Sequence, residues 1–288
     1  MQIAVCLSRL PDPETVTVDP LTGIDLGRTL YILNPADEAA LEMALRLRTA
    51  SDSVTALTVG PVETEAVLRD AIAVGADHVL RVWEEDRSET RPPVTSLLLA
   101  TAMRTEILPD LVLCGSRSLA GGSGGVAAMI AEHLDWPVAT DIMDFRIDAG
   151  LVRFQRRLPR GARSEGEVSL PAVLAVEAGT VALRYASLPG MMKGKQATIP
   201  VRHLPELGLS PSDLRFPGSL VHVATPPYPR PREIFIPDSN LPPDERLAQI
   251  TSAGVAHKSG RIVEGSPQEL ADAIFGFLRD HGFLDGAA

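Results

Sequence analysis

The stretch LVLCGSRSLAGGSGGVAAMIAEHLDWP, residues 111–137, decides how this chain folds. It begins with an apolar run, passes through a glycine-rich loop and continues with apolar residues at helical spacing, which predicts a strand, a loop and a helix. Glycines let backbone N–H groups approach a ligand closely, and the amino end of a helix favours an anion. From the glycines alone, a phosphate-binding loop and a plain flexible connection are equally good interpretations, because the spacing matches neither G-x-G-x-x-G nor a P-loop.

The composition narrows the class of protein. The chain has 288 residues, of which 45% are hydrophobic and 22% charged, enough for one ordinary core with appendages or for two small lobes. A net charge of -10 argues against a nucleic-acid surface. No apolar run approaches the roughly 20 residues of a membrane span, and no targeting segment is visible. The two cysteines form no C-x-x-C motif, and their low number favours a reducing compartment such as the cytoplasm. The histidines show no metal-ligand spacing, so we expect no metal site.

Residues 1–137 alternate short apolar runs with amphipathic segments, which predicts a mostly parallel sheet with helices on both faces. The expected strands are 3–7, 54–59, 78–82 and 111–114, with a hairpin through 19–23, and the expected helices begin at Pro35, Glu65 and Val94. Asn34 is expected to act only as the cap of the first of these helices. Cys6, Gly60 and Gly115 end three strands and should meet at the sheet edge where ligands bind, which favours the phosphate-binding interpretation.

After Pro137 the pattern changes to two-residue alternation around 148–150 and along 167–176, which predicts hairpin strands rather than βα units. The arginine-rich stretch 153–163 fits a hairpin with solvated side chains. In the stretch 184–195, one proline and two glycines argue against a helix. Its leucine and two methionines fit either a loop that docks a partner or a loop packed on its own core.

The C-terminal part reads as an arm. Residues from about 216 onward are rich in proline, which excludes a regular helix or a central strand. Ser266 is a suitable cap for a helix over 267–280 whose apolar residues share one face, and such a helix packs on its own body or on a partner subunit. The expected domains are 1–225 and 226–288, and residues 238–260 give no interpretable pattern.

With these segments in order, the chain resembles the beta subunit of an electron-transfer flavoprotein over most of residues 1–225. The likeness is carried by NPADEAALEMALRL (34–47), LRDAIAVGAD (68–77), LDWP (134–137), and LPAV (170–173) followed by RYASLPGMMKGK (184–195). The ending GRIVEG (260–265) and its helix are similar to family tails. The resemblance implies an α/β fold of the adenine-nucleotide alpha-hydrolase type, with a β-hairpin region and an extended C-terminal arm that ends in a helix and packs on the partner subunit.

The resemblance also implies cofactors and partners. In this family an alpha subunit holds most of the FAD, and the beta subunit buries AMP or, in the bifurcating type, a second FAD. The implied nucleotide-binding residues are Cys6, Asn34, Pro35, Ala36, Asp37, Val59, Gly60, Gly115, Arg117, Ser118, Gly121, Gly122, Ser123, Gly124, Gly125 and Val126. The implied partner-docking residues, within a recognition loop over 184–198, are Tyr185, Leu188, Pro189, Met191, Met192, Lys193 and Lys195. The implied partners are the alpha subunit, a flavin dehydrogenase as electron donor, and a quinone oxidoreductase or a similar acceptor.

Several positions depart from the family pattern and indicate a divergent member. Glycines and Ala120 replace the acidic and polar side chains of the nucleotide loop, so the nucleotide would be held by backbone groups or be absent. Ser8 replaces an expected lysine. Arg157 stands where many members have a glutamate, and it would repel an alpha-subunit arginine that normally pairs there.

Two other classes of function stay open at this point. One is a stand-alone nucleotide hydrolase, for which Arg117 is the only basic candidate at the phosphate loop. The other is a nucleotide-sensing module of the universal-stress type, which would need neither the recognition loop nor the arm. The resemblance implies an electron carrier rather than an enzyme, and we propose no residue of this chain as an acid, base or nucleophile.

Overall fold

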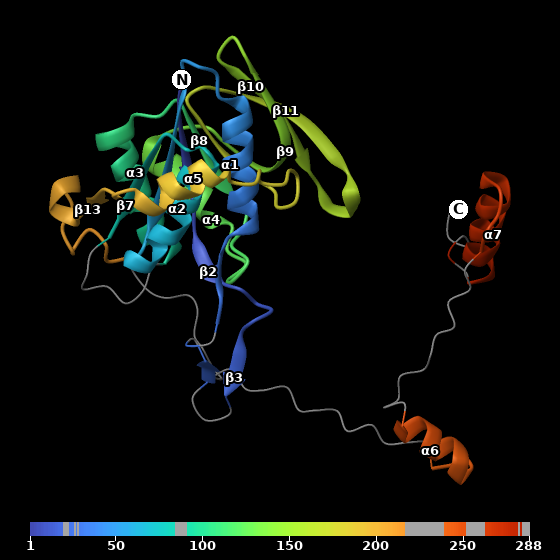
Figure 1. The fold of residues 1–288 in the computed structure, drawn as a ribbon. Helices are drawn as coiled ribbons and strands as arrows, with labels where there is room; N and C mark the ends of the chain where they lie inside the picture. The colour runs from blue at the N-terminus through green and yellow to red at the C-terminus, as the bar shows by residue number, and fades with distance from the viewer. Residues whose placement is uncertain are drawn as a thin grey trace. The chain divides into compact units, whose positions relative to one another are not determined.

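The central feature of the fold is a mostly parallel sheet. The computed structural model describes residues 1–19, 23–25, 27, 29–83, 91–216, 239–251, 263–281 and 283. Within these residues nine strands form one sheet in the order β11-β10-β9-β12-β8-β1-β6-β7-β13 (Figure 1). From β9 to β13 in this order, the strands pair with one another in parallel. At the other end of the sheet, β10 is antiparallel to both β9 and β11. Their bounds are β1 Gln2–Cys6, β6 Ser53–Val59, β7 His78–Val82, β8 Leu111–Gly115, β9 Val138–Asp148, β10 Leu151–Arg157, β11 Arg163–Ser169, β12 Ala172–Val176 and β13 Val201–Arg202.

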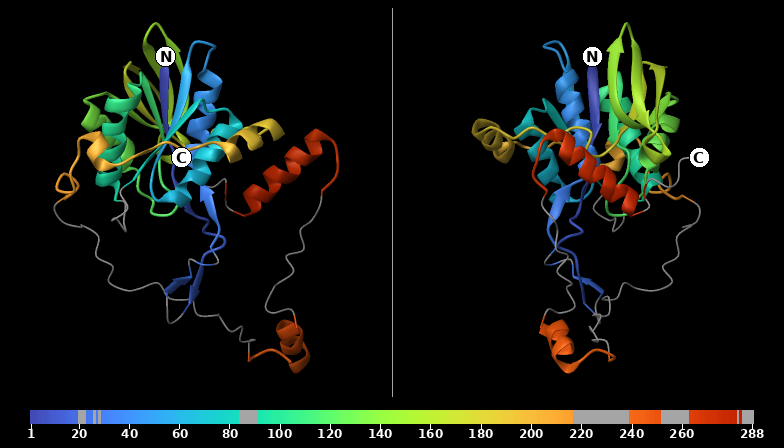
Figure 2. Two further views of the ribbon diagram at one scale, coloured as in Figure 1. Left: turned by 60° about the vertical axis from the view of Figure 1, so that its left-hand side comes forward. Right: turned by 90° about the vertical axis from the view of Figure 1, so that its right-hand side faces the viewer.

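Helices cover both faces of this sheet (Figure 2). On one face α1 (Pro35–Leu47) and α2 (Glu65–Val74) form a core with side chains such as Leu41 and Leu68. On the other face α3 (Pro92–Ala102) and α4 (Gly125–Leu134) form a second core with side chains such as Leu98 and Ile130. Burial on both faces explains why the central strands read as continuous apolar runs. The predicted α/β class is confirmed.

The order of the strands creates an opening at the carboxyl ends of β1 and β8. After β1 the chain continues to β6 on one side of it and reaches β8, on the other side, only later. Where the connections from two neighbouring strands run to opposite sides of the sheet, they leave a crevice at the carboxyl ends of those strands. Cys6 and Gly115, the last residues of β1 and β8, therefore lie at the switch point of the sheet.

Two predictions for residues 167–196 are wrong. Only β11 belongs to the hairpin region, because β12 pairs in parallel with β8 and β9 and all five of its residues are buried. An all-apolar strand of this length fits the middle of a sheet better than a hairpin. Residues 188–196 form a helix, α5, although we expected a loop there. Its proline lies in the first turn, where the missing N–H has no helical partner in any case, and Ser187 caps it by accepting a hydrogen bond from the Gly190 amide.

Other local predictions are confirmed with small changes. The helix from Glu65 to Val74 ends at Gly75 as expected. The helix begun near Val94 ends as α3 at Ala102, followed by a wider π turn over Met103–Ile107. The hairpin near residues 19–23 is formed by β3 (Thr17–Asp19) and β4 (Gly23–Asp25), and β2 (Arg9–Pro11) pairs with β5 (Tyr31–Leu33). The hairpin of β10 and β11 contains the predicted arginine-rich stretch.

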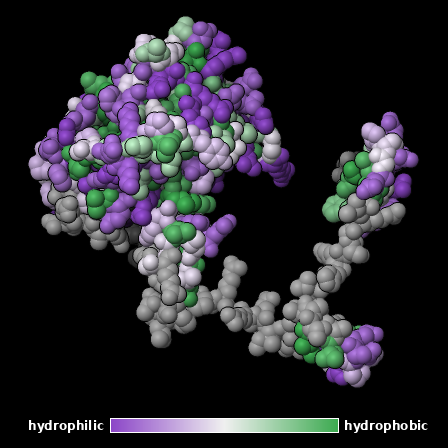
Figure 3. Space-filling model, in the orientation of Figure 1, coloured by the Kyte–Doolittle hydropathy of each residue, from purple (hydrophilic) through white to green (hydrophobic). Residues whose placement is uncertain are grey.

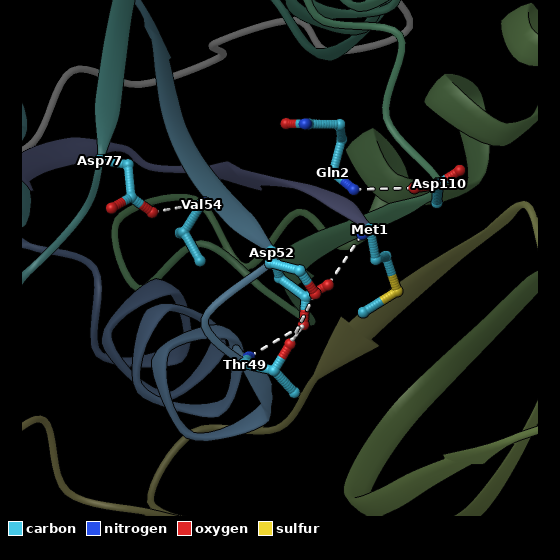
Figure 4. Close-up of polar contacts among 8 residues, drawn as sticks. Met1, Gln2, Thr49, Asp52, Val54, Asp77 and Asp110 are labelled. Carbon is cyan, nitrogen blue, oxygen red and sulfur yellow. Dashed lines mark hydrogen bonds and ion pairs between the residues drawn. The ribbon is translucent and has the colours of Figure 1, made fainter.

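Aspartates fasten the amino ends of the central strands (Figure 4). Asp52 accepts a hydrogen bond from the Met1 ammonium group at 2.7 Å. Asp77 accepts one from the Val54 amide at 2.9 Å, and Asp110 accepts one from the Gln2 amide at 2.7 Å. Each of these aspartates immediately precedes a strand and binds the start of a neighbouring one. The strand register is thus fixed at the amino edge, and the carboxyl edge is left for other contacts.

The chain divides into two compact units, residues 1–229 and 230–288. In the second unit the described elements are α6 (Pro243–Thr251) and α7 (Pro267–Asp280). The predicted cap of α7 is confirmed: Ser266 and Glu269 form a reciprocal capping box. The proline-rich stretch 217–238 and residues 252–262 lie outside the described residues. Within the described residues, no helix combines the length and the apolar composition needed to cross a membrane.

Candidate functional site

A pocket of about 330 Å³ opens at the switch point between β1 and β8. This volume is within the range typical of small-molecule sites. The ends of β1, β6 and β8, the start of α1, helix α3 and the loop before α4 all contribute to it. The residues that line it are Cys6, Leu7, Ser8, Arg9, Asn34, Asp37, Val59, Thr64, Pro92, Thr95, Leu99, Cys114, Gly115, Arg117, Ser118, Gly121, Ser123, Gly124 and Val126.

Asp37 is the junction that holds this pocket together. Its carboxylate accepts hydrogen bonds from the Ser8 amide at 2.8 Å and the Ser8 hydroxyl at 2.6 Å. It also accepts hydrogen bonds from the Asn34 side-chain amide and the Gly115 backbone amide, both at 3.0 Å. One buried carboxylate therefore joins the ends of β1 and β8 to the first turn of α1. Burial raises the pKa of Asp37 to about 6, although the bonds from Ser8, Asn34 and Gly115 act to lower it.

The prediction for Asn34 is wrong, because its side chain does not cap α1. The Asn34 amide nitrogen donates to the Arg117 carbonyl at 2.9 Å, and its oxygen accepts from the Leu119 amide at 3.2 Å. These bonds attach the glycine-rich loop to the start of α1. Asn34 sits at the capping position but organises a loop more than 80 residues away in sequence. Sequence spacing alone gives no signal of such a contact.

The glycines of the pocket differ in whether the surrounding structure leaves room for a side chain. A Cβ on Gly115 would overlap Oδ1 of Asp37, and one on Gly124 would lie 2.8 Å from the Ser116 carbonyl oxygen. At Gly121, which lines the pocket, a Cβ would meet no described atom within 4 Å. Two glycines are thus required by the fold, whereas Gly121 leaves free space beside the pocket. The residue at the cap position of α4 is Gly124, so no cap side chain accepts hydrogen bonds from the first-turn N–H groups of this helix.

The walls of the pocket differ in polarity. Val59, Pro92 and Leu99 form an apolar side, and Arg117, Ser118 and Ser123 form a polar side next to the start of α4. Cys6 and Cys114 lie side by side on β1 and β8, and a hydrogen bond to Cys114, together with burial, raises the pKa of Cys6. A planar apolar group on one side and an anionic group near α4 on the other would fit this distribution.

The predicted nucleotide residues are mostly brought together here. Among them, Pro35, Ala36, Gly60, Gly122 and Gly125 do not line the pocket, although each neighbours a residue that does or lies in the same loop. The sequence analysis missed Leu7, Ser8, Arg9, Thr64, Pro92, Thr95, Leu99 and Cys114. The three residues that directly follow β1 could have been found, since ligands lie beyond the carboxyl ends of strands. The contribution of α3 depends on packing and leaves no such signal.

The substitutions at Ser8 and Arg157 have partners within the chain. Ser8 binds Asp37, as described above. Arg157 lies 3.5 Å from the Glu177 carboxylate, which also accepts a hydrogen bond from the Ser116 hydroxyl. Arg157 is thus engaged on the rim of the glycine-rich loop. The repulsion that we predicted between Arg157 and a partner subunit stays a prediction.

A second surface is formed by α5, which packs against α2. A Cβ on Gly190 would overlap the Ala73 carbonyl oxygen, and one on Gly194 would overlap the Arg69 carbonyl oxygen. The two glycines, four residues apart, therefore form one flat face that lets the helices pack backbone to backbone. The same residues that seemed to exclude a helix are the reason that this helix fits.

The opposite face of α5 is apolar and open to solvent. Tyr185 is fully exposed, and Leu188, Met191 and Met192 are 71%, 56% and 55% exposed. Figure 3 shows hydrophobic residues on the face of the first unit where Figure 1 draws α5. Pro189, Lys193 and Lys195 are exposed beside them. The stretch 185–195 is therefore not a loop tucked into its own core.

An ion pair fixes the chain that leads into α5. Glu42, which is buried on α1, accepts hydrogen bonds from the Arg184 amide at 3.1 Å and from its guanidinium at 2.9 and 3.2 Å. Burial of Glu42 acts to raise its pKa, but the bonds from Arg184 and Arg46 outweigh this effect and lower the pKa. A bidentate pair of this kind holds a main chain firmly. The exposed apolar surface is thus presented on a rigid support.

Comparisons with known proteins identify the family of this chain. A model of the electron transfer flavoprotein domain matches residues 26–207, which is more than half of the chain. The electron transfer flavoprotein subunit beta of Bacillus subtilis is 30% identical over 281 residues, covering 97% of this chain and 98% of that protein. The same subunit of Methylophilus methylotrophus is 30% identical over 246 residues, covering 84% and 88%. The caffeyl-CoA reductase-Etf complex subunit CarD of Acetobacterium woodii is 31% identical over 214 residues, covering 73% and 81%. The chain therefore belongs to the electron transfer flavoprotein family, where it is similar along most of its length to beta subunits.

Proposed function

We propose that this chain is the beta subunit of a heterodimeric, cytoplasmic electron carrier. It would bind an alpha subunit that holds most of the redox-active FAD, receive electrons from a flavin dehydrogenase and deliver them to a quinone oxidoreductase or a similar acceptor. The carrying observation is α5: an apolar surface that is exposed yet rigidly held is typical of a protein-docking site. Family membership supports the electron-carrier role.

In this role the chain positions proteins rather than performing chemistry. The FAD, when bound, supplies the electron-transfer chemistry. Leu188 and Met191 would insert into an apolar recess on the donor, and Glu42 would keep Arg184 and the start of α5 in place. Exposed methionines adapt to the shape of a partner, which suits a carrier that must release its donor after each encounter.

We propose further that the pocket holds an adenine nucleotide. The ring would lie against Val59, Pro92 and Leu99, and the phosphate would lie near Arg117, Ser118 and the uncapped start of α4. The open space beside Gly121 supports this fit. A volume of about 330 Å³ favours AMP, because a second FAD would have to place its other half outside the pocket.

The structure gives little support to a nucleotide hydrolase. Among the described residues that line the pocket, Asp37 is the one carboxylate, and hydrogen bonds from the chain occupy both of its oxygens. It has no free oxygen with which to bind a metal ion or to activate water. A stand-alone nucleotide sensor would have no use for the exposed face of α5.

The proposal can be tested by co-expressing the chain with its candidate alpha subunit. The purified complex is denatured, and the FAD and AMP released per heterodimer are measured. One FAD with one AMP is the expected result. Two FAD would assign the pocket to a second flavin and indicate a bifurcating protein, and FAD without AMP would mean that the pocket has lost its nucleotide. If no flavin-bearing subunit associates, the proposed function is wrong.

A further inference from the structure

A groove of about 1060 Å³ runs beside α5 on the first unit. Its walls come from β2, β5, α1, α2 and residues 182–195. Much of the lining is apolar, with Val67, Ala73 and Val74 from α2 facing Leu188 and Met191 from α5. The groove is therefore continuous with the exposed apolar surface of α5. A side chain that contacts α5 from outside could extend directly into it.

Six charged residues line the groove among those that the structure describes: Arg9, Glu38, Arg69, Asp70, Arg184 and Lys195. Three of the cations are already engaged. Arg69 donates to Glu65 and to the Ala197 carbonyl, Arg184 is held by Glu42, and the guanidinium of Arg9 stacks 3.9 Å above the Tyr31 ring. The fourth cation, Lys195, is exposed to solvent.

The two acidic groups are in a different situation. Within the described part of the chain, neither the Glu38 nor the Asp70 carboxylate has a hydrogen-bond or ion-pair partner. Glu38 is partly buried, and Asp70 is exposed at the rim, but in both cases desolvation raises the pKa of the carboxyl group. The Glu38 carboxylate has thus lost some water without gaining a cation, and the Asp70 carboxylate lines the same groove without a partner among the described residues. Such groups recover free energy when a positive charge arrives.

We propose that this groove receives a segment of the docked partner, and that the segment carries an apolar side chain flanked by lysine or arginine, which pair with Glu38 and Asp70. The proposal rests on the proposed function, since the partner is the protein that docks on α5. The contact is then reciprocal: α5 inserts apolar side chains into the partner, and the partner inserts a basic, apolar segment into the chain. A second copy of this chain is a poorer occupant, because its net charge of -10 would oppose the approach.

The test uses the full-length chain and matched synthetic peptides as probes. The peptides are short amphipathic helices with identical leucines, and they carry lysine, glutamine or glutamate at two positions beside the leucines. Binding is measured by fluorescence anisotropy at low salt. We expect the lysine peptide to bind at least about 5-fold more tightly than the glutamine peptide, and the glutamate peptide to bind most weakly.

Two double variants separate the groove from the general charge of the protein. Glu38→Gln with Asp70→Asn should reduce the affinity for the lysine peptide to that for the glutamine peptide. It should leave the thermal midpoint unchanged or higher, because neither carboxylate holds a partner within the described residues. The control, Glu132→Gln with Glu165→Gln, removes the same formal charge from exposed positions on α4 and β11 and should keep the preference.

The outcomes are distinct. Equal binding of the lysine and glutamine peptides to the unmodified chain, or no binding of the lysine peptide, would overturn the proposal. Loss of the preference in the control variant would reduce it to a general effect of net charge, which also overturns it. The lysine preference could depend on Glu38 and Asp70 even if the chain recruits no flavin-bearing subunit. That result would support the proposed groove site and reject the electron-carrier function.

Discussion

Replacing Gly194 by alanine should lower the free energy of unfolding of this chain, although the same change usually stabilises a helix. Alanine in place of a helical glycine typically stabilises by about 1 kcal/mol. At Gly194 the new methyl group would overlap the Arg69 carbonyl oxygen of α2, and because this obstacle is backbone, it cannot move aside. Overpacking of this kind costs about 1–3 kcal/mol. We therefore expect a net destabilisation of up to about 2 kcal/mol, with α5 displaced from α2.

The matched control is Gly276→Ala on α7, where a Cβ would meet no described atom within 4 Å. Urea unfolding, together with hydrogen exchange of the α5 amides, measures both variants. Gly194→Ala should show a lower midpoint and faster exchange over 188–196, and Gly276→Ala should show neither. The Michaelis constant for the donor dehydrogenase should rise for Gly194→Ala, because α5 no longer presents its apolar face correctly. If Gly194→Ala is as stable as Gly276→Ala, the close packing of α5 on α2 is wrong.

Three further predictions follow from the two surfaces. Leu188→Ala should weaken turnover at low donor concentration about 10-fold or more while the FAD content stays unchanged, as expected for an anchoring side chain; equal turnover at every donor concentration would contradict this. Gly121→Val should fill the free space beside the pocket and lower the amount of bound AMP without changing the urea midpoint. Gly115→Ala, in contrast, should lower the urea midpoint, because its Cβ would overlap Asp37. If the Gly121→Val variant binds as much AMP as the unmodified chain, Gly121 is not part of the site. Asp37→Asn should flatten the pH dependence of stability between about pH 4 and 6. Since burial holds the pKa of Asp37 at about 6, above its ordinary 3.8, the folded chain binds a proton more readily than the unfolded chain, and this contribution, about 3 kcal/mol, is lost as the pH rises through that range. Parallel pH profiles for the variant and the unmodified chain would refute the assignment.

Much of the first unit could be predicted from local pattern. Apolar runs that end at Cys6, Gly60 and Gly115 placed three strands and the edge where they meet, because parallel strands buried on both faces must be continuously apolar. The caps of α7 and the end of α2 were readable because capping depends on residues within one turn.

Two of the failures share one cause, because in each a contact between distant segments gave a residue a role that its neighbours in sequence do not indicate. Asn34 looked like a cap, but its side chain reaches the loop at Arg117 and Leu119. Gly190 and Gly194 looked like helix breakers, but they are the face on which α5 meets α2. Local propensity differs by about 1 kcal/mol per glycine, which is small enough for tertiary packing to reverse.

The sequence by itself determined the α/β class, the family resemblance and the glycine-rich loop as a candidate site, because these follow from periodicity and short motifs. Only the tertiary structure decided that Asp37 gathers the ends of β1 and β8 through four hydrogen bonds. It also decided that the apolar residues of α5 face solvent and that Glu38 and Asp70 lie in one groove without partners among the described residues. Burial and hydrogen-bond satisfaction depend on which segments meet in space, and no local stretch of sequence records that.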